Sequence, residues 1–170
     1  MTADTETSDV VKRARAFALA AHGDQRYGDQ PYAVHLDAVA ELARPYGDDA
    51  RVVAYLHDVV EDTTVPLQAV RAEFGDLAAD CVALVTDASG GDRNERKAKT
   101  NKKLSQVQGP LRLALIVKAA DRLANLRACR DGARADKLAM YRAEHRAFRA
   151  AAFRAGLCDA LWTEIDAIAG

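Results

Sequence analysis

Four ionisable residues lie inside an apolar stretch of this chain and limit how it can fold. His57 and Asp58 are followed one helical turn later by Glu61 and Asp62, with valine, alanine and leucine around them. Residues four positions apart share a helix face, so His57 pairs with Glu61 and Asp58 with Asp62. Burying an unpaired charge costs several kcal/mol. We therefore predict a buried helix over about 49–62 in which His57 and Asp58 hold a divalent metal ion, with both later acids at the same centre.

The same residues also admit a purely structural interpretation. His57 would then be a core histidine satisfied by hydrogen bonds, and the three acids would lie at the end of a helix. Four such groups are rarely buried together without a function. The metal site is therefore the favoured interpretation.

A metal ion needs further ligands, and two residues elsewhere in the chain are candidates. Asp121 follows the most apolar run of the sequence, so its charge needs a partner; the alternative is an ion pair with Lys118 or Arg122. His35 begins a separate predicted helix. Two imidazoles and two carboxylates, with no thiolate, suit Mn²⁺, with Fe²⁺ and Zn²⁺ as alternatives. Such an ion lowers the pKa of bound water and neutralises phosphate charge, which favours hydrolysis.

Helical rather than alternating periodicity runs through nearly the whole chain. Its 170 residues suit one domain with a sizeable core, and we expect neither a strand nor an internal repeat. The prediction is a single all-α domain over 1–170, a bundle of about eight or more helices. The expected helices cover about 10–22, 32–43, 49–62, 66–75, 76–85, 92–107, 111–129, 134–154 and 159 onward.

Composition argues against several classes of protein. A hydrophobic content of 49% argues against disorder. No apolar stretch approaches the roughly 20 residues that span a bilayer, and the polar, acidic N-terminus does not resemble a signal peptide. Cys81, Cys129 and Cys158 are far apart and lie among apolar neighbours. We expect reduced core thiols in a cytoplasmic protein that does not bind membranes.

One segment is strongly basic. Residues 92–103 contain six basic and two acidic side chains. Such a run is usually the solvated face of a helix, but part of it could also meet a polyphosphate, and both interpretations stay open. Nucleic-acid binding is not expected, because the segment is short, no aromatic residue interleaves with it and the net charge of the chain is −1.

Four motifs follow one another along the chain: Gln25-Arg26-Tyr27-Gly28-x-x-Pro31-Tyr32-x-x-His35, Leu56-His57-Asp58-x-x-Glu61-Asp62-Thr63, Val85-Thr86-Asp87 and Lys118-x-Ala120-Asp121-x-x-x-Asn125-Leu126. Taken in order, they resemble the hydrolase domain of RelA/SpoT-type proteins, within the HD superfamily of metal-dependent phosphohydrolases. The likeness is greatest to the single-domain members, the small alarmone hydrolases, and covers about residues 10–130.

The resemblance implies an all-α, Mn²⁺-binding enzyme that removes pyrophosphate from the 3′ position of guanosine tetra- or pentaphosphate. Its implied metal ligands are His35, His57, Asp58 and Asp121. Because the chain is too short to hold the synthetase and regulatory domains of long family members as well, it is expected only to degrade this nucleotide. The protein is expected to be a monomer or a homodimer.

The resemblance also implies roles for further residues. Glu61 and Asp62 match the acids that activate and orient the attacking water. Asn125 matches a residue near the ribose and phosphate, and Arg26 matches the first of two basic residues beside the base. The second is usually Lys, but here it is Tyr27, so weaker discrimination between guanine and adenine is expected. The remaining candidate substrate contacts are Arg93 and Tyr141.

Two other functions compete with this one. The first is an HD phosphohydrolase that acts on another nucleotide, such as an adenosine 3′-pyrophosphate, a nucleoside monophosphate or NADPH. The second is a catalytically inactive module that binds nucleotides or other proteins. Intact candidate ligands and the Glu61-Asp62 pair disfavour the inactive module.

Overall fold

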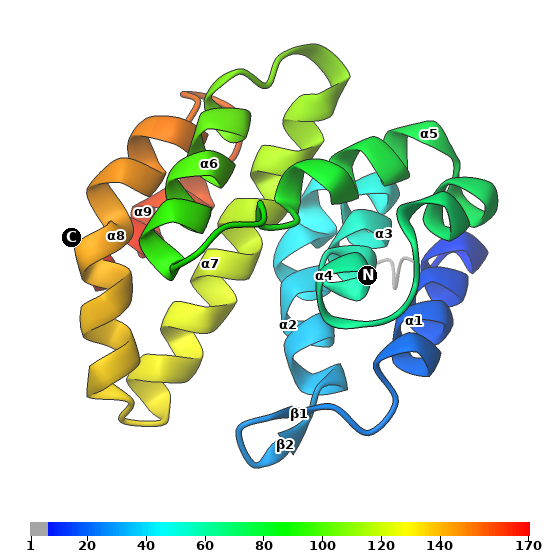
Figure 1. Ribbon diagram of the computed structural model, residues 1–170, viewed down its shortest axis with the longest axis horizontal. Coiled ribbons are helices and arrows are strands. Elements are labelled where there is room, and N and C mark those ends of the chain that lie inside the picture. The colour runs from blue at the N-terminus through cyan, green and yellow to red at the C-terminus, as the bar shows by residue number, and fades with distance from the viewer. Residues whose placement is uncertain (1–6) are drawn as a thin grey trace, which may run out of the picture.

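The computed structural model describes residues 7–170, which contain nine α-helices and two short 3₁₀ helices (Figure 1). The all-α prediction is confirmed. The α-helices are α1 (Asp9–His22), α2 (Ala33–Ala43), α3 (Asp48–Leu56), α4 (Val59–Asp62), α5 (Leu67–Val85), α6 (Arg93–Ser105), α7 (Leu113–Asp131), α8 (Ala135–Ala152) and α9 (Asp159–Ala169). The 3₁₀ helices are η1 (Arg44–Tyr46) and η2 (Gly109–Arg112).

Helix α7 is the central element of the bundle. It packs against α2, α3 and α5 on one side and against α8 and α9 on the other (Figure 1). Apolar residues are buried along most of its length, and such a helix is stable only when neighbours cover them. Leu115, Leu123 and Leu126 are fully buried. Side chains on α7 can therefore meet residues from both halves of the chain.

We expect Leu115→Ala to lower the free energy of unfolding by about 2–5 kcal/mol, because it removes buried methyl groups and leaves a cavity. Val34→Ala is the control, since Val34 is 48% exposed. Chemical denaturation of both variants measures the effect. Equal stability of the two variants would contradict the central position of α7.

The prediction of one continuous helix over 49–62 is wrong. The chain forms α3 and α4 as separate helices, with a turn at His57 and Asp58 between them. Asp58 has φ −103° and ψ −3°, away from ideal helical angles. The residues just before and just after the turn are buried or half-buried. The run of apolar residues therefore continues through the turn, and the sequence does not show where the helix ends.

At two glycines the backbone conformation differs from the prediction made from the sequence. Gly75 has φ +87° inside α5, so the two helices predicted on either side of it are the two parts of one kinked element. Gly28 has φ +60° in an antiparallel hairpin of β1 (Arg26–Tyr27) and β2 (Gln30–Pro31). No strand was expected here, because a strand of two residues is too short to show alternation.

The three cysteines are buried and free, as predicted. Within residues 7–170, no helix is both long and apolar enough to cross a bilayer.

Candidate active site

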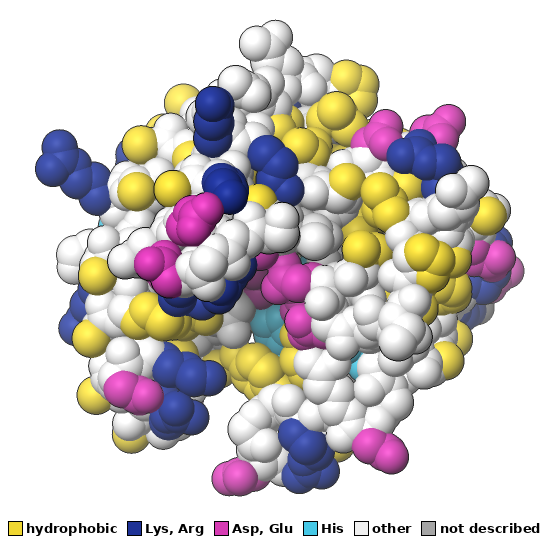
Figure 2. Space-filling view, in the orientation of Figure 1, with side chains coloured by type: hydrophobic (Ala, Val, Ile, Leu, Met, Phe, Trp, Pro, Cys, Tyr) yellow, Lys and Arg dark blue, Asp and Glu magenta, His cyan; other side chains and the backbone are white. Residues whose placement is uncertain are grey.

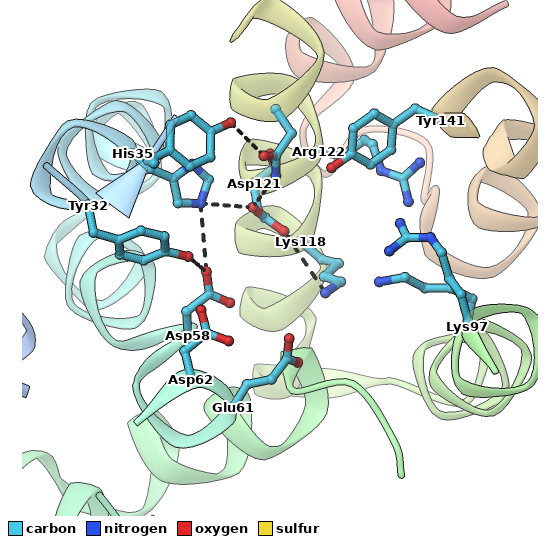
Figure 3. A pocket seen from close by; sticks show the side chains of 13 residues that line it. Tyr32, His35, Asp58, Glu61, Asp62, Lys97, Lys118, Asp121, Arg122 and Tyr141 are labelled. Carbon is cyan, nitrogen blue, oxygen red and sulfur yellow. Dashed lines mark hydrogen bonds and ion pairs between the residues drawn. The ribbon is translucent and has the colours of Figure 1, made fainter. Parts of the chain in front are cut away.

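Four side chains from three parts of the chain converge beside α7, and Figure 3 labels His35, Asp58 and Asp121 among them. His35 comes from α2, His57 and Asp58 from the turn between α3 and α4, and Asp121 from α7. The Nε2 atoms of His35 and His57 are 3.3 Å apart. His57 Nε2 lies 2.9 Å from Asp58 Oδ2, and His35 Nε2 lies 3.2 Å from Asp121 Oδ1. The structure thus brings together all four predicted ligands.

These distances fit one metal ion. Ligand atoms about 2.1 Å from an ion are separated by about 3.0–3.5 Å at octahedral or tetrahedral angles. His35, His57 and Asp58 could hold a metal ion, because each offers a ligand atom within 4.8 Å of the others. Asp121 is outside that group of three, but its Oδ1 lies 3.5 Å from His57 Nε2, and its role as the fourth ligand stays a prediction.

Neighbouring groups fix the orientation of the ligands. The His57 Nδ1–H donates to the Ala54 carbonyl at 2.7 Å, which leaves Nε2 free for a metal. The Tyr32 hydroxyl donates to Asp58 Oδ2. Asn125 Nδ2 donates to Asp121 Oδ1 at 2.8 Å. The contacts to Asp58 and Asp121 thus hold the same oxygens that lie nearest the histidines.

The charges of the centre favour a bound cation. Burial alone would lower the pKa of His57, but Asp58 and Asp121 raise that pKa well above its usual value. Burial would raise the pKa of Asp121, but hydrogen bonds with His35 and His57 hold it well below its usual value. Two partly buried carboxylates thus draw positive charge into the site, which a divalent ion can supply.

Glu61 and Asp62, on α4, lie at the edge of this centre (Figure 3). Glu61 Oε1 accepts a hydrogen bond from the Asp87 backbone N–H at 2.5 Å, so one oxygen is anchored. Burial raises the pKa of Glu61. Asp62 Oδ2 accepts a hydrogen bond from Gln25 Nε2 at 2.9 Å. Two fixed carboxylates therefore face the same pocket as the ligands.

The pocket has an acidic side and a basic side. Figure 2 shows a hollow in which acidic and histidine side chains meet basic ones. The basic side chains come from the start of α6 and from α7 (Figure 3). The lining consists of Tyr27, Tyr32, His35, Asp58, Glu61, Asp62, Arg93, Lys97, Lys118, Asp121, Arg122, Asn125 and Tyr141. A ligand that binds metal through one end and carries further negative charge would fit both sides.

The chain is similar to known proteins in both sequence and structure. Residues 14–158 match the family described as "HD domain". The chain belongs to the HD-domain family. The resemblance to RelA/SpoT-type hydrolase domains is also confirmed by the relatives and by a solved structure of similar fold.

Two relatives are large proteins that this HD domain matches in part. A probable guanosine-3′,5′-bis(diphosphate) 3′-pyrophosphohydrolase of Synechocystis is 36% identical over 124 residues, or 69% of this chain. A probable GTP pyrophosphokinase of Mycobacterium leprae is 37% identical over 129 residues, or 71% of this chain. The match covers only 16% of either relative.

One solved structure matches this HD domain over almost its whole length. It is described as a metazoan ortholog of SpoT that hydrolyses ppGpp and plays a role in starvation responses. The TM-score is 0.80 at 25% sequence identity, and the match covers 95% of this chain and 94% of the other. The helices after residue 130, where the sequence motifs end, therefore belong to the same fold.

The basic segment, residues 92–103, partly faces the pocket and partly forms a solvated helix face. Arg93 and Lys97, four residues apart on α6, line the pocket. Lys97 Nζ lies 2.5 Å from Asp87 Oδ2, and burial lowers the pKa of Lys97. Lys99 is half-exposed and pairs with Glu95, as in a solvated helix face. Only part of the segment thus faces the pocket.

The predicted substrate contacts occupy different places. Asn125, Arg93 and Tyr141 line the pocket, and burial raises the pKa of Tyr141 to about 12, so its hydroxyl stays protonated. Tyr27 also lines it; its ring stacks on His35 at 4.7 Å. Arg26 is exposed, donates to the Asp29 carbonyl and is not among the lining residues. Its contact with a base stays a prediction.

Sequence reasoning did not single out Lys97 or assign Lys118 and Arg122 to the substrate. Lys118 and Arg122 were considered only as ion-pair partners of Asp121, and Lys118 Nζ does lie 4.0 Å from Asp121 Oδ2. Arg122 is paired with Glu144 instead. Spacing offered one signal, because Lys97 follows Arg93 by one helical turn.

Proposed function

We propose that this domain hydrolyses guanosine 3′,5′-bis(diphosphate) and the corresponding pentaphosphate at the 3′ position and releases pyrophosphate. The observation that carries the proposal is the pocket itself, with four metal-ligand candidates on one side and four cationic side chains on the other. A nucleotide with phosphates at both ends meets both requirements. The Synechocystis relative and the SpoT ortholog, named for this activity, support the assignment.

Mn²⁺ is the ion we propose for His35, His57, Asp58 and Asp121. When bound, such an ion lowers the pKa of a water and neutralises phosphate charge. Mixed nitrogen and oxygen ligands also suit Fe²⁺ and Zn²⁺. Metal analysis of the purified protein, followed by reloading with each ion, identifies the one that restores activity.

The residues of the chain divide the remaining work. The free oxygen of Glu61 takes a proton from the attacking water, and Asp62 orients that water. The water oxygen bonds to the phosphorus nearest the ribose, and the bond from that phosphorus to the 3′ oxygen breaks. The 3′ oxygen gains a proton and leaves as a hydroxyl group. Lys97 and Lys118, which both approach Asp87, stabilise the extra negative charge.

Product identification tests the proposal. Protein loaded with Mn²⁺ and given guanosine tetraphosphate should yield GDP and pyrophosphate, and EDTA should stop the reaction. Adenosine 3′-pyrophosphates, nucleoside monophosphates and NADPH form the comparison panel. If a member of that panel releases orthophosphate and the guanosine substrate is not turned over, the proposal is wrong and the protein hydrolyses that other nucleotide. Turnover of no substrate by metal-loaded protein would favour an inactive binding module.

The environment of Tyr27 bears on purine preference. Its hydroxyl donates to Asn125 Oδ1 at 2.7 Å, and its ring stacks on His35. The hydroxyl is therefore engaged within the protein and is not free to recognise the base. We therefore expect weak discrimination between guanine and adenine.

We expect wild-type kcat/KM for the guanine and adenine 3′-pyrophosphates to differ by less than about 10-fold. Tyr27→Lys should increase the ratio by about 10-fold, because a lysine donor can reach the O6 or N7 acceptors of guanine. Tyr27→Phe keeps the ring on His35 and serves as the control, with an unchanged ratio. Strong guanine preference in the wild type would refute the prediction.

Compartment and assembly remain proposals. We propose a cytoplasmic enzyme whose partner is the nucleotide substrate, without nucleic acid or membrane. Size-exclusion chromatography with light scattering distinguishes a monomer from a homodimer.

A further inference from the structure

Glu144, on α8, joins two arginines that come from different helices. Its carboxylate accepts from Arg93 Nε at 2.6 Å and from Arg93 Nη2 at 3.3 Å. The same carboxylate accepts from Arg122 Nη2 at 3.3 Å. Arg93 lies on α6 and Arg122 on α7, so one carboxylate holds side chains from three helices together.

Both arginines line the pocket, whereas the carboxylate that joins them lies outside it. Arg93 and Arg122 line the pocket that contains the candidate metal ligands, but Glu144 does not. Glu144 lines a neighbouring groove between α6 and α8, and Arg122 lines both spaces. Seen from the pocket, the carboxylate thus lies behind the two guanidinium groups.

Aromatic rings complete the support. The Arg122 guanidinium lies 4.7 Å from the Tyr141 ring and 4.3 Å from the Phe148 ring, and Arg93 lies 6.0 Å from Tyr141. Arg122 is buried, and within residues 7–170 its Nη1 has no hydrogen-bond partner. Burying a donor in this way is unfavourable unless another group can accept from it.

Arg122 and Tyr141 lie across the pocket from His35 and Asp58 (Figure 3). Glu61, His35 and Asp58 occupy the opposite side, so a group that meets the arginines is not the group that meets these residues (Figure 3). Guanidinium groups in a fixed orientation match the oxygens of phosphate. The two sides therefore suit two separate phosphate groups of one substrate.

We propose that Glu144 is a positioning residue that orients Arg93 and Arg122 to bind a substrate phosphate remote from the metal centre. This inference rests on the proposed function, in which that group is the 5′ phosphate chain. It also assigns a role to α8, which lies beyond the motifs that suggested the function.

The direction of the expected effect separates positioning from charge. Glu144 is negative, so removing its charge would by itself strengthen the binding of an anion. Loss of positioning acts in the opposite direction, because the ligand must then order two long side chains. Weaker anion binding after loss of the carboxylate is thus the result that only positioning explains.

Calorimetry with inorganic pyrophosphate, in EDTA, tests the arginines without a metal and without turnover. We expect Glu144→Gln to weaken pyrophosphate binding by about 10-fold, through the ordering of freed side chains. Glu144→Asp keeps the charge and the partner of buried Arg122 but shortens the side chain, and it should weaken binding as well. If Glu144→Gln does not fold, Glu144→Asp takes its place in this test.

Glu164→Gln is the matched control. Glu164 also binds an arginine through both oxygens, with 2.7 Å to Arg127 Nε, and it too joins α7 to a C-terminal helix. It does not line the pocket, so pyrophosphate binding should not change. Equal or tighter pyrophosphate binding by folded Glu144 variants would overturn the inference.

Kinetics distinguish this inference from the proposed function. With guanosine tetraphosphate, Glu144→Gln should raise KM by about 10-fold, with kcat within about 2-fold. With a substrate that has the 3′-pyrophosphate but a 5′-hydroxyl, KM should not change. A wild type that hydrolyses neither substrate removes the proposed function, while the calorimetry still decides the role of Glu144. An equal KM increase for both substrates would overturn the remote-phosphate assignment.

Discussion

Asp121→Ala is expected to remove the metal and the hydrolytic activity together. Asp121 Oδ1 lies 3.2 Å from His35 Nε2 and 3.5 Å from His57 Nε2, so its loss takes a charged ligand from the centre. Even changes outside the ligand set reduce metal affinity about 10–100-fold, so loss of a ligand should reduce it by at least about 100-fold. Turnover should fall below detection at micromolar Mn²⁺.

Metal analysis after dialysis, together with a Mn²⁺ titration of activity, measures this effect. Asp131→Ala is the matched control, because Asp131 lies on the same helix, is exposed and pairs with Arg130 at the surface. It should keep both metal and activity. Full metal occupancy in folded Asp121→Ala would remove Asp121 from the ligand set.

Glu61→Gln is expected to keep the metal and to lower kcat by about 10²–10⁴-fold, the usual range for loss of a general acid or base. The amide preserves shape and can still accept the hydrogen bond from the Asp87 N–H. It cannot take a proton from water. Metal content measured on the same sample separates this chemical effect from loss of the ion.

The pH profile provides an independent check of Glu61. Burial raises its pKa, so the carboxylate takes up a proton at a higher pH than an ordinary glutamate. As a base it must be ionised; wild-type kcat/KM should therefore fall with decreasing pH through this raised pKa. Glu61→Gln should lose that limb, whereas Glu73→Gln, at a half-exposed ion pair with Arg13, should keep it. An unchanged profile in Glu61→Gln would assign the limb to another group.

Local sequence determined the helices and the candidate ligands. Periodicity of 3.6 residues is a local property, so the all-α class and most helix positions followed from it. His57 and Asp58 stood out because charged groups within an apolar run need a partner, and this requirement holds in any fold. Asp121 was found by the same reasoning, and the structure places it beside both histidines.

Tertiary structure decided the details that depend on neighbours distant in sequence. The turn at His57 and Asp58 lies within a continuous apolar run, so composition gives no sign of it. The two-residue strands of the hairpin are too short for a periodic signal.

Glu144 illustrates the same limit most clearly. It meets Arg93 across 51 residues and Arg122 across 22 residues of sequence. In the sequence it is one acid on an amphipathic helix, equivalent to any solvated glutamate. Its role depends on how α6, α7 and α8 pack, because only packing brings two cations within reach of one carboxylate and excludes water from the group.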